Sequence, residues 1–194
     1  MTGDGPLGAR AIAAICDTLA REIEPRTELI HQTPFQLLVA VVLSAQATDR
    51  SVNAATARLF PVAGTPQAII DLGEAGLAPY VRTIGLWRAK ARNLVALSRL
   101  LLERHGGAVP GDRAALEALP GVGRKTASVV LNIVFNVPTI AVDTHVHRVA
   151  NRLGITATRH PDDTQAVLER RIPKRHLLHA HQDRKSTRLN SSHS

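Results

Sequence analysis

Cysteine and aromatic residues are scarce in this chain of 194 residues. Cys16 is its one cysteine, which excludes an internal disulfide and a metal cluster held by cysteines alone. Three Phe, one Tyr and one Trp are fewer than a protein that stacks aromatic rings on single-stranded bases normally carries. The longest apolar run, Leu37–Leu43, is far shorter than the roughly 20 residues that cross a bilayer. The sequence therefore indicates neither a disulfide-rich protein nor a membrane protein.

The charge balance indicates a polyanionic partner. Lys and Arg total 24 against 16 Asp and Glu, which gives a formal net charge of +8 at pH 7. Hydrophobic residues make up 44% of the chain, an ordinary share for a folded protein with a core. A positive charge of this size favours association with nucleic acid, which is the first partner to consider.

The hydrophobic pattern has helical spacing along almost the whole chain. Thr33-Pro34 and Thr65-Pro66 each combine a capping side chain with a proline suited to the first helical turn. Helices are expected at residues 11–22, 34–43, 48–60, 66–72, 79–84, 86–105, 113–119, 124–135, 143–153 and 161–171. No segment has convincing strand periodicity. The expected fold class is therefore all-α, a compact bundle with short loops.

The segment Leu119–Lys125, LPGVGRK, joins two expected helices through a turn with two glycines. Glycine permits a positive φ and leaves the backbone N–H groups of the turn accessible. Such groups, together with the N-terminus of the following helix, can bind an anion such as a DNA phosphate. The spacing alone also allows an ordinary connection between two helices.

Lys125 lies in the first turn of the helix expected at residues 124–135. The positive end of the helix dipole and the neighbouring Arg124 both disfavour the charged ammonium. Both effects therefore favour a neutral, nucleophilic amine. The alternative is a surface lysine that binds phosphate, which needs no such tuning.

Chain geometry can place Asp143 near Lys125. A helix over residues 124–135 is about 18 Å long. Residues 137–142, if extended, span about 20 Å, so the chain can run out along the helix and return beside it. An amine and a carboxylate would then share one site. Asp143 is also a good N-cap for the helix that follows, and the two roles are compatible.

Four longer segments match the sequence pattern of a known protein family: LLVAVVLSAQATDRSVNAAT, TIGLWRAKARNL, LPGVGRKTASVVLN and TIAVDTHVHRVANRLG. Together they resemble the endonuclease III family of DNA glycosylases and abasic-site lyases, in the helix-hairpin-helix, Gly/Pro…Asp superfamily. The resemblance covers about Cys16 to Arg171 without large gaps.

The resemblance implies a helix-hairpin-helix glycosylase fold of two helical domains, with DNA across the cleft between them. On that basis residues 27–137 form a six-helix barrel that contains the hairpin. Residues 1–26 add an N-terminal helix to a second domain, which residues 138–182 continue incompletely. Residues 183–194 are polar and without periodicity, and we expect a disordered or foreign tail there.

The resemblance also implies base-excision repair of double-stranded DNA that contains damaged bases or abasic sites. Such an enzyme removes oxidised pyrimidines and cleaves the strand 3′ to the abasic site by β-elimination. Lys125 matches the amine that attacks the sugar C1′ and forms a Schiff base, and Asp143 matches a carboxylate that assists base departure and proton transfer. The residues implied to contact DNA are Gln46, Leu86, Leu119, Gly121, Val122, Gly123, Arg124 and His145. We expect a monomer in the bacterial cytoplasm, associated with the nucleoid and not with a membrane.

The chain departs from the family pattern in its cofactor. Most members end with four cysteines spaced C-x6-C-x2-C-x5-C, which bind a [4Fe–4S] cluster, whereas no cysteine follows Cys16 here. We therefore expect no cluster and no other metal in this chain, and a sequence truncated before the cluster segment. Residues 176–182, HLLHAHQ, resemble the beginning of the helix that leads to the cluster.

Two other functions remain open from the sequence. A helix-hairpin-helix fragment that binds DNA without catalysis would keep the hairpin and the basic charge but would not need Lys125 and Asp143 together. An adenine-mismatch glycosylase of the same superfamily typically lacks a lysine at the position of Lys125 and carries an added C-terminal domain, and both points count against this alternative.

Overall fold

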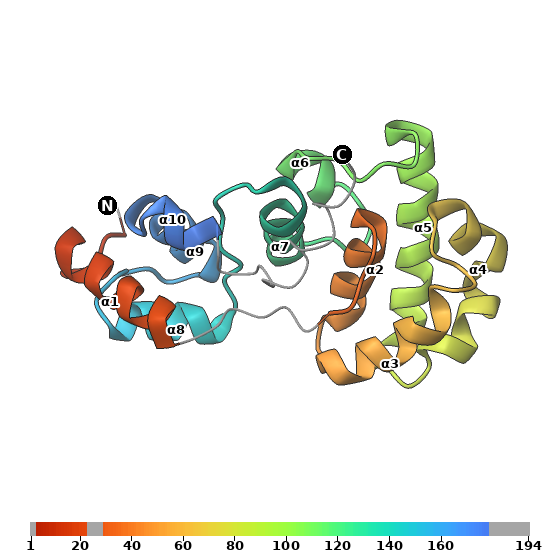
Figure 1. The fold of residues 1–194 in the computed structure, drawn as a ribbon, viewed down its shortest axis with the longest axis horizontal. Helices are drawn as coiled ribbons and strands as arrows, with labels where there is room; N and C mark the ends of the chain where they lie inside the picture. The colour runs from red at the N-terminus through yellow and green to blue at the C-terminus, as the bar shows by residue number, and fades with distance from the viewer. Residues whose placement is uncertain (1–2, 23–28, 179–194) are drawn as a thin grey trace, which may run out of the picture. The chain divides into compact units, whose positions relative to one another are not determined.

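The computed structural model of the chain describes residues 3–22 and 29–178 (Figure 1). Within these residues the only pairing of β type is one isolated bridge between Asp4 and Thr156. The helices are α1 (Ala9–Glu22), α2 (Pro34–Ser44), α3 (Asp49–Leu59), α4 (Pro66–Val81), α5 (Trp87–His105), α6 (Arg113–Glu117), α7 (Arg124–Phe135), α8 (Thr144–Arg152), α9 (Pro161–Arg171) and α10 (Lys174–Leu178). The all-α fold class is confirmed. No helix in this described part is long and apolar enough to cross a membrane.

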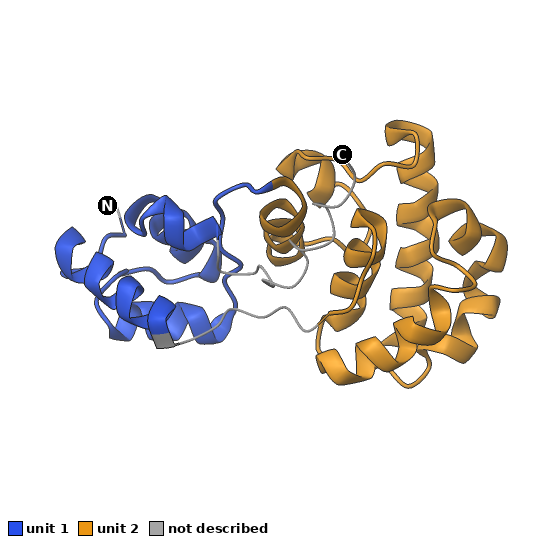
Figure 2. Cartoon of the chain, in the orientation of Figure 1, with its two compact units in different colours: residues 1–27, 136–194 blue, residues 28–135 orange. Residues whose placement is uncertain are grey.

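The chain divides into two compact units (Figure 2). Unit 1 is made of residues 1–27 and 136–194, and unit 2 of residues 28–135. Helices α2 to α7 lie in unit 2, and α1 and α8 to α10 lie in unit 1. The tail expected at residues 183–194 lies outside the described residues.

Helix α2 is the centre of the unit 2 core. Every residue from Phe35 to Leu43 is buried, which confirms the buried helix expected from a segment that is apolar on nearly all faces. The helix begins after Thr33, whose hydroxyl oxygen accepts a hydrogen bond from the backbone N–H of Gln36 at 3.1 Å. Helices α3, α5 and α7 pack against α2 (Figure 1).

Side-chain caps begin three further helices where the sequence predicts them. Thr48, Thr65 and Asp112 each accept a hydrogen bond from the backbone N–H three residues later, at 3.3, 3.3 and 2.9 Å. They begin α3, α4 and α6. Each cap satisfies a backbone donor that the helix itself leaves unpaired, so these boundaries follow from the local sequence.

Two features of the helices differ from the expectation. The break expected between residues 72 and 79 falls at Gly73, where φ is 63° and ψ is 177°, and α4 then continues to Val81 with Pro79 inside it. Glycine adopts these angles without the steric cost that a side chain brings, which places the break there and not at the proline. Helix α9 is also not the last, because α10 follows it over Lys174–Leu178.

In unit 1, Glu169 anchors the extended segment before α8 to α9. Its Oε1 accepts hydrogen bonds from the hydroxyl of Thr139, from the backbone N–H of Ile140 at 3.4 Å and from Nε2 of Gln165 at 2.8 Å. The side chain of Thr139 is almost completely buried. This network holds the segment that leads directly into Asp143.

A pH-dependent contact joins α1 to α10. Oδ1 of Asp17 accepts hydrogen bonds from Arg175 at 3.0 Å and from Nε2 of His176 at 2.7 Å. The hydrogen bond from Arg175, and then the one from His176, lowers the pKa of Asp17 below its usual 3.8. The ionised carboxylate therefore stabilises the folded state of unit 1.

Asp17→Asn is expected to lower the stability of the protein slightly, because the lost contact is exposed. A lowered folded pKa contributes stability above the usual value of 3.8 and loses it as the pH falls through the folded value. The difference in melting temperature between parent and variant should thus have its largest value at neutral pH. The difference should shrink as the pH falls below 3.8, and a difference that grows on acidification would contradict the assignment.

Candidate DNA-binding and catalytic site

The hairpin between α6 and α7 exposes backbone and buries its apolar side chains. Leu119 is 2% exposed and Val122 is 5% exposed, so both side chains pack into the core of unit 2. The backbone N–H of Val122 donates to the carbonyl of Leu119 at 3.0 Å and closes the turn. Gly121 and Gly123 lie on the surface. The side chains of Leu119 and Val122 therefore shape the hairpin, and any contact of these two residues with DNA is made by their backbone.

Gly121 brings the hairpin close to α5. Its φ is 80°, and a Cβ atom on it would lie 2.9 Å from Nδ2 and 3.0 Å from Cβ of Asn93. We expect Gly121→Ala to destabilise the protein by about 1–3 kcal/mol, because a side chain is strained at this φ and Asn93 must move. Gly123→Ala is the matched control, since a Cβ there has nothing within 4 Å. Equal melting temperatures of the two variants would contradict the prediction.

Lys125 and Arg124 follow the hairpin in the first turn of α7, and both are exposed. Nε of Arg124 lies 4.0 Å from Oε1 of Glu117, which also lies 3.6 Å from Nη1 of Arg113. Two cations thus stand beside exposed backbone at a helix N-terminus. This arrangement suits a phosphate group.

Asp143 is the N-cap of α8. Its Oδ1 accepts hydrogen bonds from the backbone N–H groups of His145 at 2.9 Å and Val146 at 3.0 Å, which confirms the capping role and orients the carboxylate. His145 is exposed in the first turn of the same helix. Asp143 lies in unit 1 and Lys125 in unit 2. The structure positions each of these two side chains within its own unit. That Lys125 and Asp143 come together in one site stays a prediction.

Gln46 and Leu86 are exposed on two adjacent loops of unit 2. Gln46 lies between α2 and α3 with a φ of 56°, and Leu86 precedes α5 with a φ of 59°. A left-handed backbone costs a residue other than glycine about 1–3 kcal/mol, so the surroundings must hold both positions. Leu86 is 65% exposed although it is apolar. A Cβ on Gly85 would lie 3.8 Å from the carbonyl oxygen of Gln46, so the two loops are close neighbours.

Lys90, in the first turn of α5, is a buried lysine that the sequence analysis did not single out. Its side-chain ammonium donates hydrogen bonds to the carbonyl oxygens of Leu43 at 2.8 Å and Ala45 at 2.6 Å. Burial lowers the pKa of Lys90. A lysine on an amphipathic helix usually faces solvent, so its sequence position gave no signal of this contact.

Comparison with known proteins identifies the family. Residues 39–174 match the family model described as HhH-GPD superfamily base excision DNA repair protein. Endonuclease III of Escherichia coli (strain K12) is 54% identical over 157 residues, which are 81% of this chain and 74% of the relative. Endonuclease III of Treponema pallidum (strain Nichols) is 51% identical over 176 residues, 90% and 83% of the two chains. The chain belongs to the endonuclease III family.

A solved structure of an endonuclease III agrees with this fold. It is the trapped endonuclease III–DNA covalent intermediate in an estranged-adenine complex, which is 44% identical in sequence. The TM-score is 0.84, and the match covers 90% of this chain and 83% of that chain. The helix-hairpin-helix glycosylase fold expected from the sequence is confirmed.

The iron–sulfur cluster of the endonuclease III family does not fit the residues of this chain. A [4Fe–4S] cluster is typically held by four cysteine thiolates, and Cys16 is the one cysteine in the sequence. Cys16 is half-buried in α1, where burial, followed by the charge of Asp17, raises the pKa of its thiol. Among residues 3–22 and 29–178, no group of three or more His, Cys, Asp or Glu could hold a metal ion.

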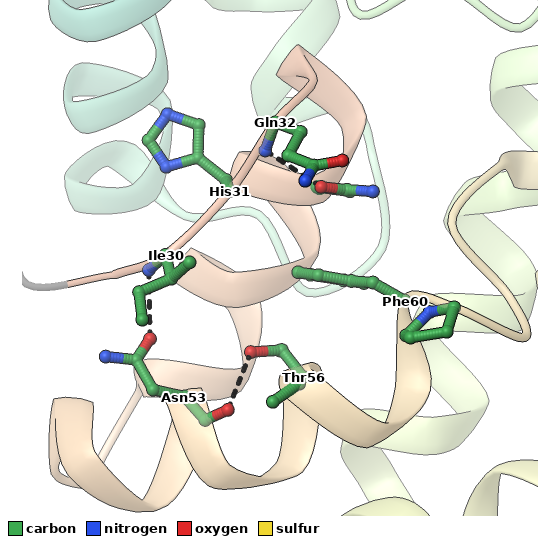
Figure 3. Close-up of a pocket in the computed structure, with 9 residues that line it drawn as sticks. Ile30, His31, Gln32, Asn53, Thr56 and Phe60 are labelled. Atoms are coloured by element: carbon green, nitrogen blue, oxygen red, sulfur yellow. Dashed lines mark hydrogen bonds between the residues drawn. The ribbon is translucent and has the colours of Figure 1, made fainter. Parts of the chain in front are cut away.

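A pocket of about 250 Å³ lies in unit 2 between α3 and the segment before α2 (Figure 3). Ile30, His31, Asn53 and Phe60 are among its lining residues, and the backbone N–H of Ile30 donates to Oδ1 of Asn53 at 2.9 Å. None of the residues expected to contact DNA or to act in catalysis lines this pocket. It is therefore separate from the site that the endonuclease III resemblance assigns.

Proposed function

We propose that this chain removes oxidised pyrimidines from duplex DNA, with Lys125 as the attacking amine and Asp143 as the assisting carboxylate. Base-excision glycosylase and abasic-site lyase activity follows from the relationship to endonuclease III at 54% identity. DNA binding is supported by the similarity to an endonuclease III–DNA intermediate and by the net charge of +8. The choice of oxidised pyrimidines rests on the family resemblance.

The observation that carries the assignment of Lys125 is its place directly after the hairpin. An exposed amine in the first turn of α7 stands beside backbone N–H groups that can bind a DNA phosphate. Binding of that phosphate would bring the neighbouring sugar to the amine. The relative in the covalent intermediate is joined to DNA, and an amine is a nucleophile that forms such a bond at a sugar carbon.

The proposed reaction uses the amine of Lys125 and the carboxylate of Asp143. The amine attacks C1′ as the glycosidic C–N bond breaks, and the base leaves with the bonding electron pair and takes up a proton. Opening of the sugar ring gives a protonated Schiff base. Loss of a proton from C2′ then expels the 3′ phosphate with its electron pair, and water releases Lys125. Asp143 assists base departure and transfers protons in these steps.

Gln46 and Leu86 are the proposed wedge residues, the pair of side chains that fill the gap left by a flipped base. A base inside an intact stack cannot be attacked at C1′, and flipping it out costs on the order of a few kcal/mol. One polar and one apolar side chain on adjacent loops can offset that cost. His145 would lie near the damaged base.

The remaining assignments rest on the resemblance and on charge. Residues 27–137 would form the six-helix barrel, and residues 1–26 with 138–182 the second domain. The proposed DNA is damaged or abasic duplex, bound by one copy of the chain. Bacterial relatives and the net charge of +8 support action at the nucleoid in the cytoplasm.

Borohydride trapping tests the proposal. One duplex carries a thymine glycol and another an abasic site, and peptide mapping identifies the residue joined to the DNA. We expect a covalent complex on both duplexes, with the DNA remnant on Lys125. A folded protein that binds both duplexes without forming a complex would favour a binding fragment without catalysis. An adenine-mismatch glycosylase is disfavoured by the relationship to endonuclease III and by the lysine itself.

A further inference from the structure

The buried ammonium of Lys90 takes no part in the chemistry above. Lys90 is only 5% exposed, and a buried charge is unfavourable unless hydrogen-bond partners satisfy it. Its hydrogen bonds go to the carbonyl oxygens of Leu43 and of Ala45, which immediately precedes Gln46. A costly group therefore stands directly beside one of the two wedge residues.

The two carbonyl groups belong to the C-terminal end of α2. The last carbonyls of a helix lack partners within the helix and carry the negative end of its dipole, so a cation is favourable there. The last turn of α2 contains no basic residue of its own. Lys90 supplies that cation from α5 and holds the chain from which the Gln46 loop emerges.

The same lysine is joined to the second wedge residue through the backbone. The N–H of Lys90 donates to the carbonyl of Leu86 at 3.1 Å, within the first turn of α5. Leu86 and Gln46 both have a positive φ, which a residue with a side chain keeps only where the surrounding structure enforces it. Lys90 thus contacts both of the strained loops, one by its side chain and one by its backbone.

We propose that Lys90 is a positioning residue that holds Gln46 and Leu86 in the arrangement needed for insertion into the DNA stack. This proposal rests on the proposed function, in which these two side chains form the wedge. Lys90 acts through the end of α2 and does not touch DNA. Without the ammonium, the end of α2 loses its cap and the Gln46 loop relaxes, so the two side chains no longer fill the gap together.

Lys90→Met tests the proposal, because methionine keeps an unbranched, apolar side chain but has neither the charge nor the N–H donors. The direct readout is the fluorescence of 2-aminopurine placed opposite a tetrahydrofuran abasic analogue, which rises when the base is displaced from the stack. We expect the variant to lose most of this rise at saturating protein. Excision of thymine glycol from a duplex should fall about 10- to 100-fold, the effect of a misplaced contact.

Trapping on a single-stranded abasic oligonucleotide is the internal control, since this substrate has no duplex stack to open. We expect Lys90→Met to trap it at the parental level. Leu101→Ala is the matched control for lost stability, because Leu101 is fully buried on the same helix but about 16 Å further along it. At a temperature where the Leu101→Ala variant is folded, this variant should keep both the fluorescence rise and excision from the duplex.

Lys90→Gln keeps an N–H donor without the charge and should recover part of the fluorescence rise, and it replaces Lys90→Met if that variant does not fold. Parental fluorescence and excision in Lys90→Met would overturn the proposal. So would equal losses on duplex and single strand, or failure of both variants to fold. The double variant Gln46→Ala/Leu86→Ala tests the wedge assignment separately from the role of Lys90. If this double variant excises thymine glycol at the parental rate, the wedge assignment itself fails, whatever the Lys90 variants show.

Discussion

Lys125→Ala is expected to abolish the covalent complex with DNA. Without the amine no Schiff base forms, so trapping on thymine glycol and abasic duplexes should fall to background, and strand cleavage with it. Lys125 is exposed in the first turn of α7, and alanine is a strong helix former, so the melting temperature should not fall. Gel separation of the trapped complex measures the loss.

Lys125→Arg separates a nucleophile from a cation that only binds phosphate. Arginine keeps the positive charge beside the hairpin, but its guanidinium stays protonated and does not attack the sugar. We expect DNA affinity near the parental value together with complete loss of trapping. A parental yield of trapped complex from this variant would place the nucleophile at another residue.

Asp143→Asn is expected to slow base excision by about 10²–10⁴-fold, the usual contribution of a general acid or base. Stability should change little, because asparagine caps a helix about as well as aspartate. The hydrogen bonds from the backbone N–H groups of His145 and Val146 would therefore persist. Single-turnover excision of thymine glycol, with melting temperature alongside, measures the two effects separately.

Comparison of Asp143→Ala with Asp143→Asn isolates the contribution of the cap. This variant loses the carboxylate and the cap together, so about 0.5–2 kcal/mol of stability should go with the activity. If Asp143 were only a cap, Asp143→Asn would keep parental excision while Asp143→Ala lost stability. That combination would remove Asp143 from the chemistry.

The helix starts could be predicted from the sequence because a cap joins residues only two or three positions apart. Thr33 and Thr65 both accept the backbone hydrogen bond that the sequence predicts. The break in α4 begins after residue 72, as the sequence predicts, but its extent was not predictable because glycines and a proline compete as signals over residues 72–79. Only the backbone angles at Gly73 decide between them.

The candidate site was predictable to a different degree. The motif around the hairpin indicates Lys125 as the candidate amine, and the segment before α8 indicates Asp143 as the candidate carboxylate. Whether the two side chains meet depends on chain geometry across two units. Leu119 and Val122 were predicted to contact DNA, and the structure places their side chains in the core. A motif shows which residues form the hairpin, whereas burial shows which of their atoms are accessible to DNA.

The sequence by itself therefore determined the all-α class, the capped helix starts, the hairpin and the family. Only the tertiary structure decided the contacts between distant positions. Lys90 bonds to Leu43, 47 positions away, and Gly121 approaches Asn93. Lysine ordinarily prefers the surface, so no pattern of polarity predicts its burial. The packing of α5 against α2 brings it to the carbonyl groups that stabilise the ammonium.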